Sequence, residues 1–213
     1  MRTLGQPSAA RVLAVDTQFG LARAHLYPAA VPRGLLVLGH GAGGGVDAPD
    51  LVAVAQAVRE DGMSVALVEQ PYRVAGRRAP APARQLDIAW SEVVAVLRLA
   101  GPAALPLIAG GRSSGARVAC RTATAVGASA VLCLAFPLQP PGSRGGREVA
   151  SRLPELDAAG VPVLVVQGDR DPFGLPPAAP QRTVVRVPGD DGLKADLGAV
   201  TASVLAWLAA VLG

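Results

Sequence analysis

Short continuous apolar runs alternate along the chain with segments whose apolar residues recur at helical spacing. Continuous runs of this kind are typical of strands that are covered on both faces. Six runs have this character: 34–40, 64–70, 105–110, 130–136, 161–168 and 182–189. Strands that alternate with helices form a mostly parallel sheet, because parallel neighbours are joined by crossover helices. The alternation therefore predicts an α/β fold, a doubly wound sheet with helices on both faces.

The segments between the runs predict the helices and an entry hairpin. Arg11–Thr17 and Leu21–Tyr27, joined by a turn at Gly20, predict an antiparallel hairpin ahead of the parallel strands. Segment 73–85 is rich in Pro, Ala and Arg and predicts a loop that forms one wall of a site. One helix is predicted to begin near Pro49 and to end before Gly62, and a second to run from about Leu86 to Leu99. A third follows the 105–110 run and extends to about Val126, with Gly127 as its cap, and the last runs from about Lys194 to Leu212.

Composition favours one ordered domain that spans residues 1–213. Hydrophobic residues make up 51% of the 213 residues and charged residues 17%, which is enough to build a large core. The net charge is +4, but the arginines are spread along the chain, so we do not expect nucleic-acid binding. Cys120 and Cys133 lie in apolar segments and predict buried thiols of a reducing compartment. Neither a signal peptide nor a membrane helix is evident, so a cytoplasmic location is predicted.

The stretch GHGAGG after the first apolar run matches the dinucleotide-binding fingerprint. Gly39, Gly41 and Gly44 have the required spacing. Glu69 ends the next predicted strand 25 residues beyond Gly44, where a ribose-binding acid is expected. The following helix begins near Pro49, however, so its N-terminus would not point at a pyrophosphate. We therefore predict no nicotinamide or flavin cofactor, no other cofactor and no metal site.

A Gly-x-Ser-x-Gly pattern lies between a predicted strand and a predicted helix. It is formed by Gly111, Ser113 and Gly115 in the stretch GGRSSGARVA. A nucleophile elbow needs this arrangement, because its sharp turn leaves room only for glycine at the flanking positions. The turn also places the hydroxyl at a helix N-terminus, whose dipole stabilises developing negative charge. We interpret Ser113 as a nucleophile rather than as a serine that merely caps a helix.

Under this interpretation, backbone N–H groups from two turns form an oxyanion hole. The glycine-rich turn supplies the N–H of Ala42 or Gly43, and the N–H of Ser114 is its partner. Both glycine motifs then belong to one reaction.

The stretches LVLGHGAGG, EQPYRVAGRR, GGRSSGARVA and VVQGDRDPFG together resemble the α/β-hydrolase superfamily. They are most similar to its compact, lid-less branch, the dienelactone-hydrolase-like and Tex/KANL-type proteins, from about residue 30 to the end of the chain. The resemblance implies an eight-stranded type of sheet and the order serine, acid, histidine along the chain. It places the acid at Asp171, with Asp169 as the alternative, and it gives His40 a structural role in the oxyanion turn. Tyr72 and Arg112 are expected beside the substrate.

The histidine that the resemblance implies is absent. It would follow the last strand, where the chain reads GDDGL, so Asp191 stands in its place. A second position that often carries histidine in the family is occupied by Gln139. The chain holds only His25, on the predicted hairpin, and His40. An ordinary aspartate has a pKa of about 3.9, two to three units below imidazole, and is therefore a weaker base.

We therefore predict a serine hydrolase of small carboxylic esters or lactones with weak turnover and with Ser113, Asp171 and Asp191 as its catalytic residues. The alternative is a non-catalytic binding or scaffold protein that has kept the pocket. A third option is a base from elsewhere, for which His40 is the only imidazole in reach. The partner is a small molecule, and neither a nucleic acid nor a membrane is expected. An anionic substrate such as a lactone carboxylate is predicted if the arginines near the site bind it rather than being solvated at the surface: Arg73, Arg77, Arg78 and Arg112.

Overall fold

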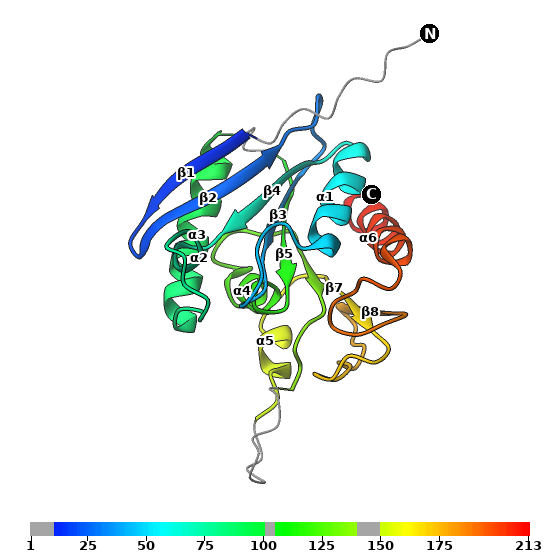
Figure 1. Cartoon of the computed structure of the whole chain (residues 1–213). Coiled ribbons are helices and arrows are strands. Elements are labelled where there is room, and N and C mark those ends of the chain that lie inside the picture. The colour runs from blue at the N-terminus through cyan, green and yellow to red at the C-terminus, as the bar shows by residue number, and fades with distance from the viewer. Residues whose placement is uncertain (1–10, 101–104, 140–149) are drawn as a thin grey trace.

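The computed structural model describes residues 11–100, 105–139 and 150–213, and its strands form one eight-stranded sheet (Figure 1). The strands are β1 (Arg11–Thr17), β2 (Gly20–Tyr27), β3 (Leu35–Gly39), β4 (Ser64–Glu69), β5 (Leu107–Arg112), β6 (Ala130–Leu134), β7 (Val163–Gly168) and β8 (Arg182–Val187). Their order in the sheet is β1-β2-β4-β3-β5-β6-β7-β8. β2 is antiparallel to β1 and β4, and the strands from β4 to β8 pair in parallel. The predicted fold class, including its N-terminal hairpin, is confirmed.

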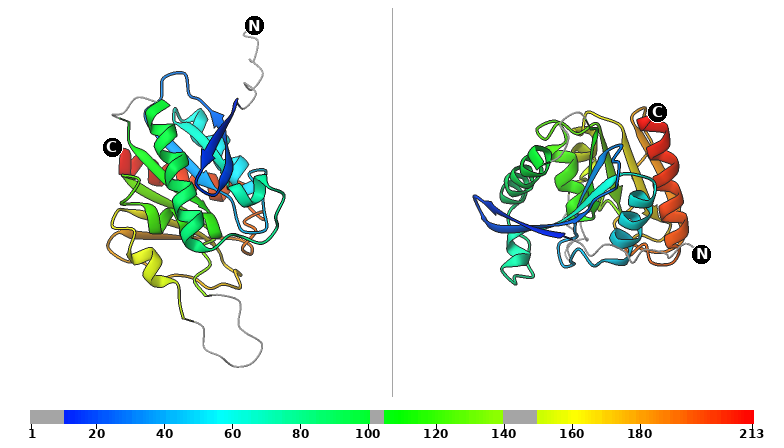
Figure 2. Two further views of the ribbon diagram at one scale, coloured as in Figure 1. Left: turned by 90° about the vertical axis from the view of Figure 1, so that its left-hand side faces the viewer. Right: turned by 90° about the horizontal axis from the view of Figure 1, so that it is seen from above.

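Helices cover both faces of the sheet (Figure 2). They are α1 (Pro49–Glu60), α2 (Pro71–Val74), α3 (Ala83–Ala100), α4 (Ser114–Thr122), α5 (Leu153–Asp157) and α6 (Leu197–Leu212). α1 and α6 pack together on one face, and α3, α4 and α5 follow one another across the other face. Each face has its own core because successive residues of a strand point to opposite sides of a sheet. Trp90 and Phe136 are fully buried on the α3–α4 side, whereas Leu36, Leu51 and Met63 are fully buried on the α1–α6 side.

Three helix boundaries lie three or four residues from their predicted positions. One of them is the start of α6, which falls at Leu197 rather than at Lys194. α3 begins at Ala83, three residues before the predicted start at Leu86. α4 ends at Thr122 rather than at Val126, and an irregular turn follows that ends at Gly127 with a φ of 65°. Gly127 therefore has the left-handed conformation expected of a glycine cap, although the regular helix stops earlier.

Two short helices were not predicted. α2 begins just before the segment 73–85 that was predicted as a loop and extends into it, and α5 follows β6. Each has a proline at its first or second position, where the missing N–H costs nothing and the fixed φ favours a helical turn. Both are a turn or so long, too short to show the 3.6-residue apolar spacing on which the sequence prediction relies.

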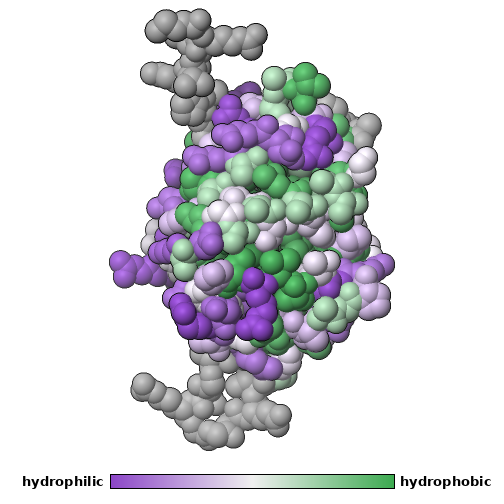
Figure 3. Space-filling view, turned by 90° about the vertical axis from the view of Figure 1, so that its right-hand side faces the viewer, coloured by the Kyte–Doolittle hydropathy of each residue, from purple (hydrophilic) through white to green (hydrophobic). Residues whose placement is uncertain are grey.

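The outer side of α6 bears no charge. The chain has no charged residue between Leu197 and Gly213, and Val200, Val204 and Leu208 bury the inner side of the helix. Apolar residues gather across the middle of the face that carries α1 and α6 (Figure 3). Across residues 11–100, 105–139 and 150–213, none of the helices combines the length and the apolar character needed to cross a bilayer.

The parallel strands bring the predicted site residues to one edge of the sheet. The oxyanion turn follows β3, Tyr72 follows β4, Ser113 follows β5, Asp171 follows β7 and Asp191 follows β8. The C-terminal ends of parallel strands share one edge, which is where ligands bind in open α/β sheets.

Candidate active site

Ser113 has a backbone conformation that residues with a side chain rarely adopt. Its φ is 52° and its ψ is −109°, and α4 begins at the next residue. The N–H of Ser113 donates to the carbonyl of Leu134 at 2.9 Å, which extends the pairing of β5 with β6 up to the turn. The Ser113 side chain makes no capping hydrogen bond to α4, and it is half-buried. This conformation is that of a sharp strand-to-helix turn, and the serine is not serving as a helix cap.

Glycines on both sides of Ser113 let the turn pack directly on β3. A Cβ at Gly111 would stand 2.5 Å from the carbonyl oxygen of Gly39. A Cβ at Gly115 would also come closer to the Gly39 backbone than any real contact allows. The tight strand–turn–helix geometry therefore depends on glycine at both positions, as the sequence pattern predicted.

The turn after β3 is held by hydrogen bonds to its carbonyl groups. The Tyr72 hydroxyl donates to the carbonyl of Ala42 at 2.8 Å, and the N–H of Gly44 donates to the carbonyl of Gly41 at 3.2 Å. Within the described residues, the N–H groups of Ala42, Gly43 and Ser114 have no acceptor. The turn lies next to the elbow, because a Cβ at Gly41 would stand 3.6 Å from the Cβ of Ser113.

Both ring nitrogens of His40 are already in hydrogen bonds. Nε2 accepts the N–H of Gln70 at 3.1 Å, so Nδ1 carries the proton and donates to the carbonyl of Gly41 at 2.8 Å. The ring is buried, and burial lowers the pKa of His40. The bond to Gly41 and the charge of Glu69 oppose this fall, whereas the charge of Arg73 adds to it. A neutral imidazole with no free nitrogen cannot take a proton from Ser113. This geometry excludes the option that His40 supplies the base.

The loop after β7 presents Asp171 and uses Asp169 elsewhere. Asp171 accepts the N–H of Phe173 at 2.8 Å and the side-chain amide of Gln167 at 2.6 Å. Asp169 accepts the N–H of Gly189 at 2.9 Å and thereby joins the ends of β7 and β8. Of the two acids considered for the site, Asp169 is thus engaged in holding loops together, and Asp171 is the one held by its neighbours at the strand end.

The loop after β8 packs against the end of β7. A Cβ at Gly168 would stand 2.3 Å from the carbonyl oxygen of Asp190, so the two segments are in direct contact. The Asp190 carboxylate accepts the N–H of Gly192 at 2.9 Å, and Leu193 is fully buried with a φ of 50°. These contacts fix the loop, and they leave the carboxylate of Asp191 half-buried near Asp171.

The pKa of Asp171 is raised to about 6. Burial is the main cause, opposed by the hydrogen bond from Phe173; the Asp191 carboxylate raises the pKa further and Arg112 lowers it. Asp171 thus lies within electrostatic reach of two carboxylates of the loop after β8, Asp191 and Asp190. Arg112 is the basic residue of this cluster.

Arg112 is engaged by the protein rather than free for substrate. Its Nη2 donates to the carbonyl of Asp191 at 2.7 Å, and its Nε lies 3.1 Å from a carboxylate oxygen of Asp50. Arg73 donates to the carbonyl of Arg77 at 3.2 Å, and Arg77 and Arg78 are exposed. The guanidinium of Arg112 thus faces a carboxylate and a carbonyl of the protein, and the binding of an anionic substrate by these arginines stays a prediction.

The two remaining positions lie at the margins of the site. The N–H of Gln139 donates to the carbonyl of Phe173 at 2.7 Å, so this segment contacts the Asp171 loop through its backbone. His25 lies on β2, and its Nε2 is 3.9 Å from the Glu69 carboxylate. His25 belongs to the hairpin side of the sheet, as predicted, and takes no part in the site.

Sequence reasoning missed two buried polar residues, Gln167 and Asp50. Gln167 is fully buried on β7, and its amide also donates to the carbonyl of Phe136 at 3.0 Å. Asp50 is fully buried in the first turn of α1. The sequence does contain a hint of each residue. Gln167 is a polar residue within an apolar strand, and Asp50 is an acid at the start of a helix whose apolar residues face the core. Neither hint identifies the residue with which the buried group pairs, because that pairing forms only in the folded chain.

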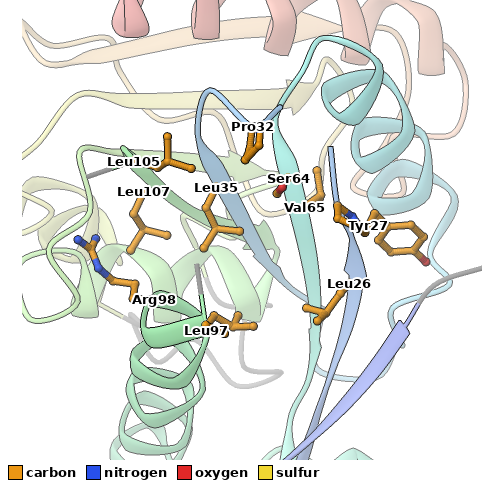
Figure 4. Close-up of a pocket in the computed structure, with 12 residues that line it drawn as sticks. Leu26, Tyr27, Pro32, Leu35, Ser64, Val65, Leu97, Arg98, Leu105 and Leu107 are labelled. Atoms are coloured by element: carbon orange, nitrogen blue, oxygen red, sulfur yellow. The ribbon is translucent and has the colours of Figure 1, made fainter. Parts of the chain in front are cut away.

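An apolar pocket of about 170 Å³ lies at the opposite edge of the sheet from Ser113 (Figure 4). It is lined by residues at the starts of β3, β4 and β5, such as Leu35, Val65 and Leu107, and by Leu97 of α3. Its position and apolar lining separate it from the candidate site. Among the described residues, no group of three or more His, Cys, Asp or Glu side chains is placed to hold a metal ion.

An open sheet in this strand order, with a serine elbow between β5 and α4, defines the α/β-hydrolase class of proteins. The family model described as an alpha/beta hydrolase domain matches residues 32–185, and the chain belongs to this family. No curated protein matches the sequence.

Solved structures agree with the family. A serine hydrolase without a lid from Xanthomonas campestris is 23% identical, with 95% of this chain and 96% of that one covered at a TM-score of 0.70. A dienelactone hydrolase from Anabaena variabilis is 16% identical, with 96% and 99% covered at a TM-score of 0.73. An esterase from Pyrococcus furiosus is 14% identical, with 100% and 99% covered at a TM-score of 0.75. These structures share the fold of this chain, and the chain is a member of the α/β-hydrolase superfamily.

Proposed function

We propose that the protein hydrolyses small carboxylic esters or lactones with Ser113 as the nucleophile. The observation that carries the proposal is the backbone of Ser113, which is left-handed at a residue with a side chain. Such strain costs about 1–3 kcal/mol and persists at functional sites when the surroundings enforce it. Here the glycines that flank the serine and the contact with β3 enforce it, and the hydroxyl is left half-buried and without a hydrogen bond inside the described part of the chain.

The proposed reaction proceeds through an acyl-serine. The Ser113 oxygen attacks the ester carbonyl carbon while its proton passes to the carboxylate pair of Asp171 and Asp191. The carbonyl oxygen becomes an oxyanion, which accepts hydrogen bonds from the N–H of Ser114 and that of Ala42 or Gly43. Collapse of this intermediate breaks the ester bond, and the alcohol leaves with the proton. Water then repeats the two steps on the acyl-serine and releases the acid.

The carboxylate pair makes the reaction slow but not impossible. A pKa of about 6 brings Asp171 close to the pKa of imidazole, about 6.5, which suits a base at neutral pH. A carboxylate without an imidazole nevertheless lacks the partner that a serine triad uses to carry the proton. In a related triad the loss of the histidine costs about 10⁶ in turnover, and about 10³–10⁴ over water remains from the oxyanion hole and binding.

Charge at the site supports a neutral substrate. Asp171 and Asp191 bring negative charge to the strand ends, and Arg112 is committed to Asp50 and to the Asp191 carbonyl. A small neutral ester or lactone avoids repulsion by this pair. The names of the solved neighbours, a dienelactone hydrolase and an esterase, agree with that class of substrate. The buried free thiols of Cys120 and Cys133 support action in a reducing compartment such as the cytoplasm.

A second candidate function is binding without turnover. It is favoured by one observation: within the described residues no side chain makes a hydrogen bond to the Ser113 hydroxyl, and the only imidazole near the turn is fully engaged. A protein of this kind would bind acyl-type ligands at the Ser113 turn and release them unchanged.

A fluorophosphonate probe separates the two functions. We expect the wild type to be labelled on Ser113, Ser113→Ala to remain unlabelled, and Ser114→Ala to be labelled like the wild type, because only the backbone of Ser114 takes part. Labelling is detected by intact mass and peptide mapping. Absence of labelling in the wild type would leave the binding function as the better account.

A further inference from the structure

The side chain of Arg112 contacts three other segments of the site. Its Nη2 donates to the Asp191 carbonyl in the loop after β8, and its Nε faces Asp50 in the first turn of α1. Its Nη1 lies 3.2 Å from the place that a Cβ of Gly41 would take, so the guanidinium packs on the backbone of the oxyanion turn. One side chain of the elbow thus joins β5, the oxyanion turn, α1 and the loop after β8.

Asp50 holds the guanidinium from the buried side. The Asp50 side chain is 1% exposed, and neither of its oxygens makes a regular hydrogen bond to a described residue. Burial raises the pKa of Asp50, and the charge of Arg112 is the largest effect that opposes this rise. A buried carboxylate without such a partner is strongly unfavourable. The ion pair therefore fixes where the guanidinium can lie.

The bond to the loop after β8 goes to a backbone carbonyl. Because Arg112 binds the carbonyl of Asp191 and not its side chain, the loop is held in the same way whatever side chain residue 191 carries. Arg112 consequently sets the distance between the elbow and the side chain of residue 191. This role is separate from the charge that Arg112 contributes to the carboxylate pair.

We propose that Arg112 is a positioning residue that holds the Asp191 loop against the Ser113 turn and is itself oriented by Asp50. The catalytic importance of the Asp191 loop rests on the proposed function. The contacts by which Arg112 holds that loop belong to the fold and do not depend on it. A lysine can replace the charge of Arg112, but its single ammonium group cannot contact Asp50 and the Asp191 carbonyl with the same two-sided geometry.

The test follows backbone hydrogen exchange at Gly192 and Leu193, whose N–H groups bond to Asp190 inside the loop. We expect Arg112→Met and Arg112→Lys to raise exchange at these amides about tenfold or more, because local opening becomes easier once the loop loses its tie to the elbow. Arg117→Met is the matched control, since Arg117 of α4 is paired with Glu155 of α5 at 2.6 Å and, within the described part of the chain, forms no ion pair or side-chain hydrogen bond with the loop after β8. It should leave exchange in this loop unchanged.

A second measurement distinguishes positioning from a general loss of stability. We expect the rate of fluorophosphonate labelling to fall about tenfold or more in Arg112→Lys, because a displaced loop carries its carboxylate away from Ser113. In that variant the pH midpoint of labelling should stay near that of the wild type, because the positive charge beside Asp171 is retained. In Arg112→Met the midpoint should rise, because the charge that lowers the pKa of Asp171 is lost.

If Arg112→Met does not fold, the double variant Asp50→Asn/Arg112→Met replaces it in the exchange experiment, because it removes both buried charges together. It should show the same rapid exchange at Gly192 and Leu193. Unchanged exchange in every folded Arg112 variant, or equal acceleration in Arg117→Met, would overturn the positioning role. If the wild type is not labelled, the proposed hydrolase function fails, whereas the exchange comparison still decides the role of Arg112.

Discussion

The backbone of Gly115 lies so close to that of Gly39 that a Cβ at position 115 would stand 2.3 Å from the Gly39 carbonyl oxygen. Gly39 ends β3, and Gly115 is in the first turn of α4. The contact therefore packs the end of β3 directly against the first turn of α4. The glycine that closes the Gly-x-Ser-x-Gly pattern is needed for this packing, not for its own φ, which is not in the left-handed region.

Substitution of Gly115 by alanine should destabilise the protein severely. Because the obstacle is backbone on both sides, neither partner can move aside without breaking the sheet or α4, and we expect the free energy of unfolding to fall by about 3 kcal/mol or more. Urea denaturation followed by circular dichroism measures the change. Gly43→Ala is the control, because its Cβ would meet nothing within 4 Å, and it should stay within about 0.5 kcal/mol of the wild type. A small effect in Gly115→Ala would contradict the contact.

Replacement of Ser113 by glycine should give a more stable protein than replacement by alanine, although both changes remove the nucleophile. Glycine adopts positive φ without strain, whereas alanine keeps the strain of the Ser113 backbone. We expect Ser113→Gly to unfold with a free energy about 1 kcal/mol higher than Ser113→Ala, measured by urea denaturation. Ser114 is the control position, and the opposite order is expected there. Because Ser114 is in α4, Ser114→Gly should be less stable than Ser114→Ala by about 1 kcal/mol. Equal stability of the two Ser113 variants would mean that the turn is not strained.

Restoring an imidazole at position 191 should raise turnover. In the proposed reaction Asp191→His would accept the proton of Ser113, and the carboxylate of Asp171 would stabilise the imidazolium that forms. We expect the rate of p-nitrophenyl acetate hydrolysis to increase by about two orders of magnitude or more, a small part of the loss caused by removal of a triad histidine. Asp190→His is the matched control and should give no gain, because the Asp190 carboxylate faces the N–H of Gly192 inside the loop. No gain in Asp191→His would show that position 191 is not where the family's histidine belongs.

The strands and the sharp turn at Ser113 could be predicted because they depend on local patterns. Continuous apolar runs between glycines indicated β3, β5 and β7, and the spacing of Gly111, Ser113 and Gly115 indicated the turn that joins β5 to α4. The role of Arg112 could not be predicted, since its partners Asp50 and Asp191 are 62 and 79 residues away in the chain. The sequence shows that an arginine precedes the serine, but whether that arginine faces solvent, substrate or a buried acid is decided by tertiary packing. The same holds for Gln167, whose partner Asp171 becomes its neighbour only when the chain turns at the end of β7.

The raised pKa of Asp171 should be visible as a titration near pH 6. Burial is the main cause of the raised pKa, and the neighbouring Asp191 carboxylate raises the pKa further. Carbon-detected NMR of the Asp171 carboxyl group measures the midpoint. We expect Asp191→Asn to lower this midpoint, because it removes the repulsion, whereas Asp16→Asn, which alters an exposed carboxylate of β1, should leave it unchanged.

The same shift fixes the sign of a contribution to stability. Since the pKa of Asp171 is raised from 3.8 to about 6 on folding, the folded state binds more protons than the unfolded state between these values. The contribution of Asp171 therefore favours folding below pH 3.8 and is lost as the pH rises through about 6. Urea denaturation between pH 4 and pH 7 should show a smaller decline in stability for Asp191→Asn than for the wild type. An equal or steeper decline in Asp191→Asn would mean that the two carboxylates do not interact, and that the proton taken from Ser113 cannot be shared between them.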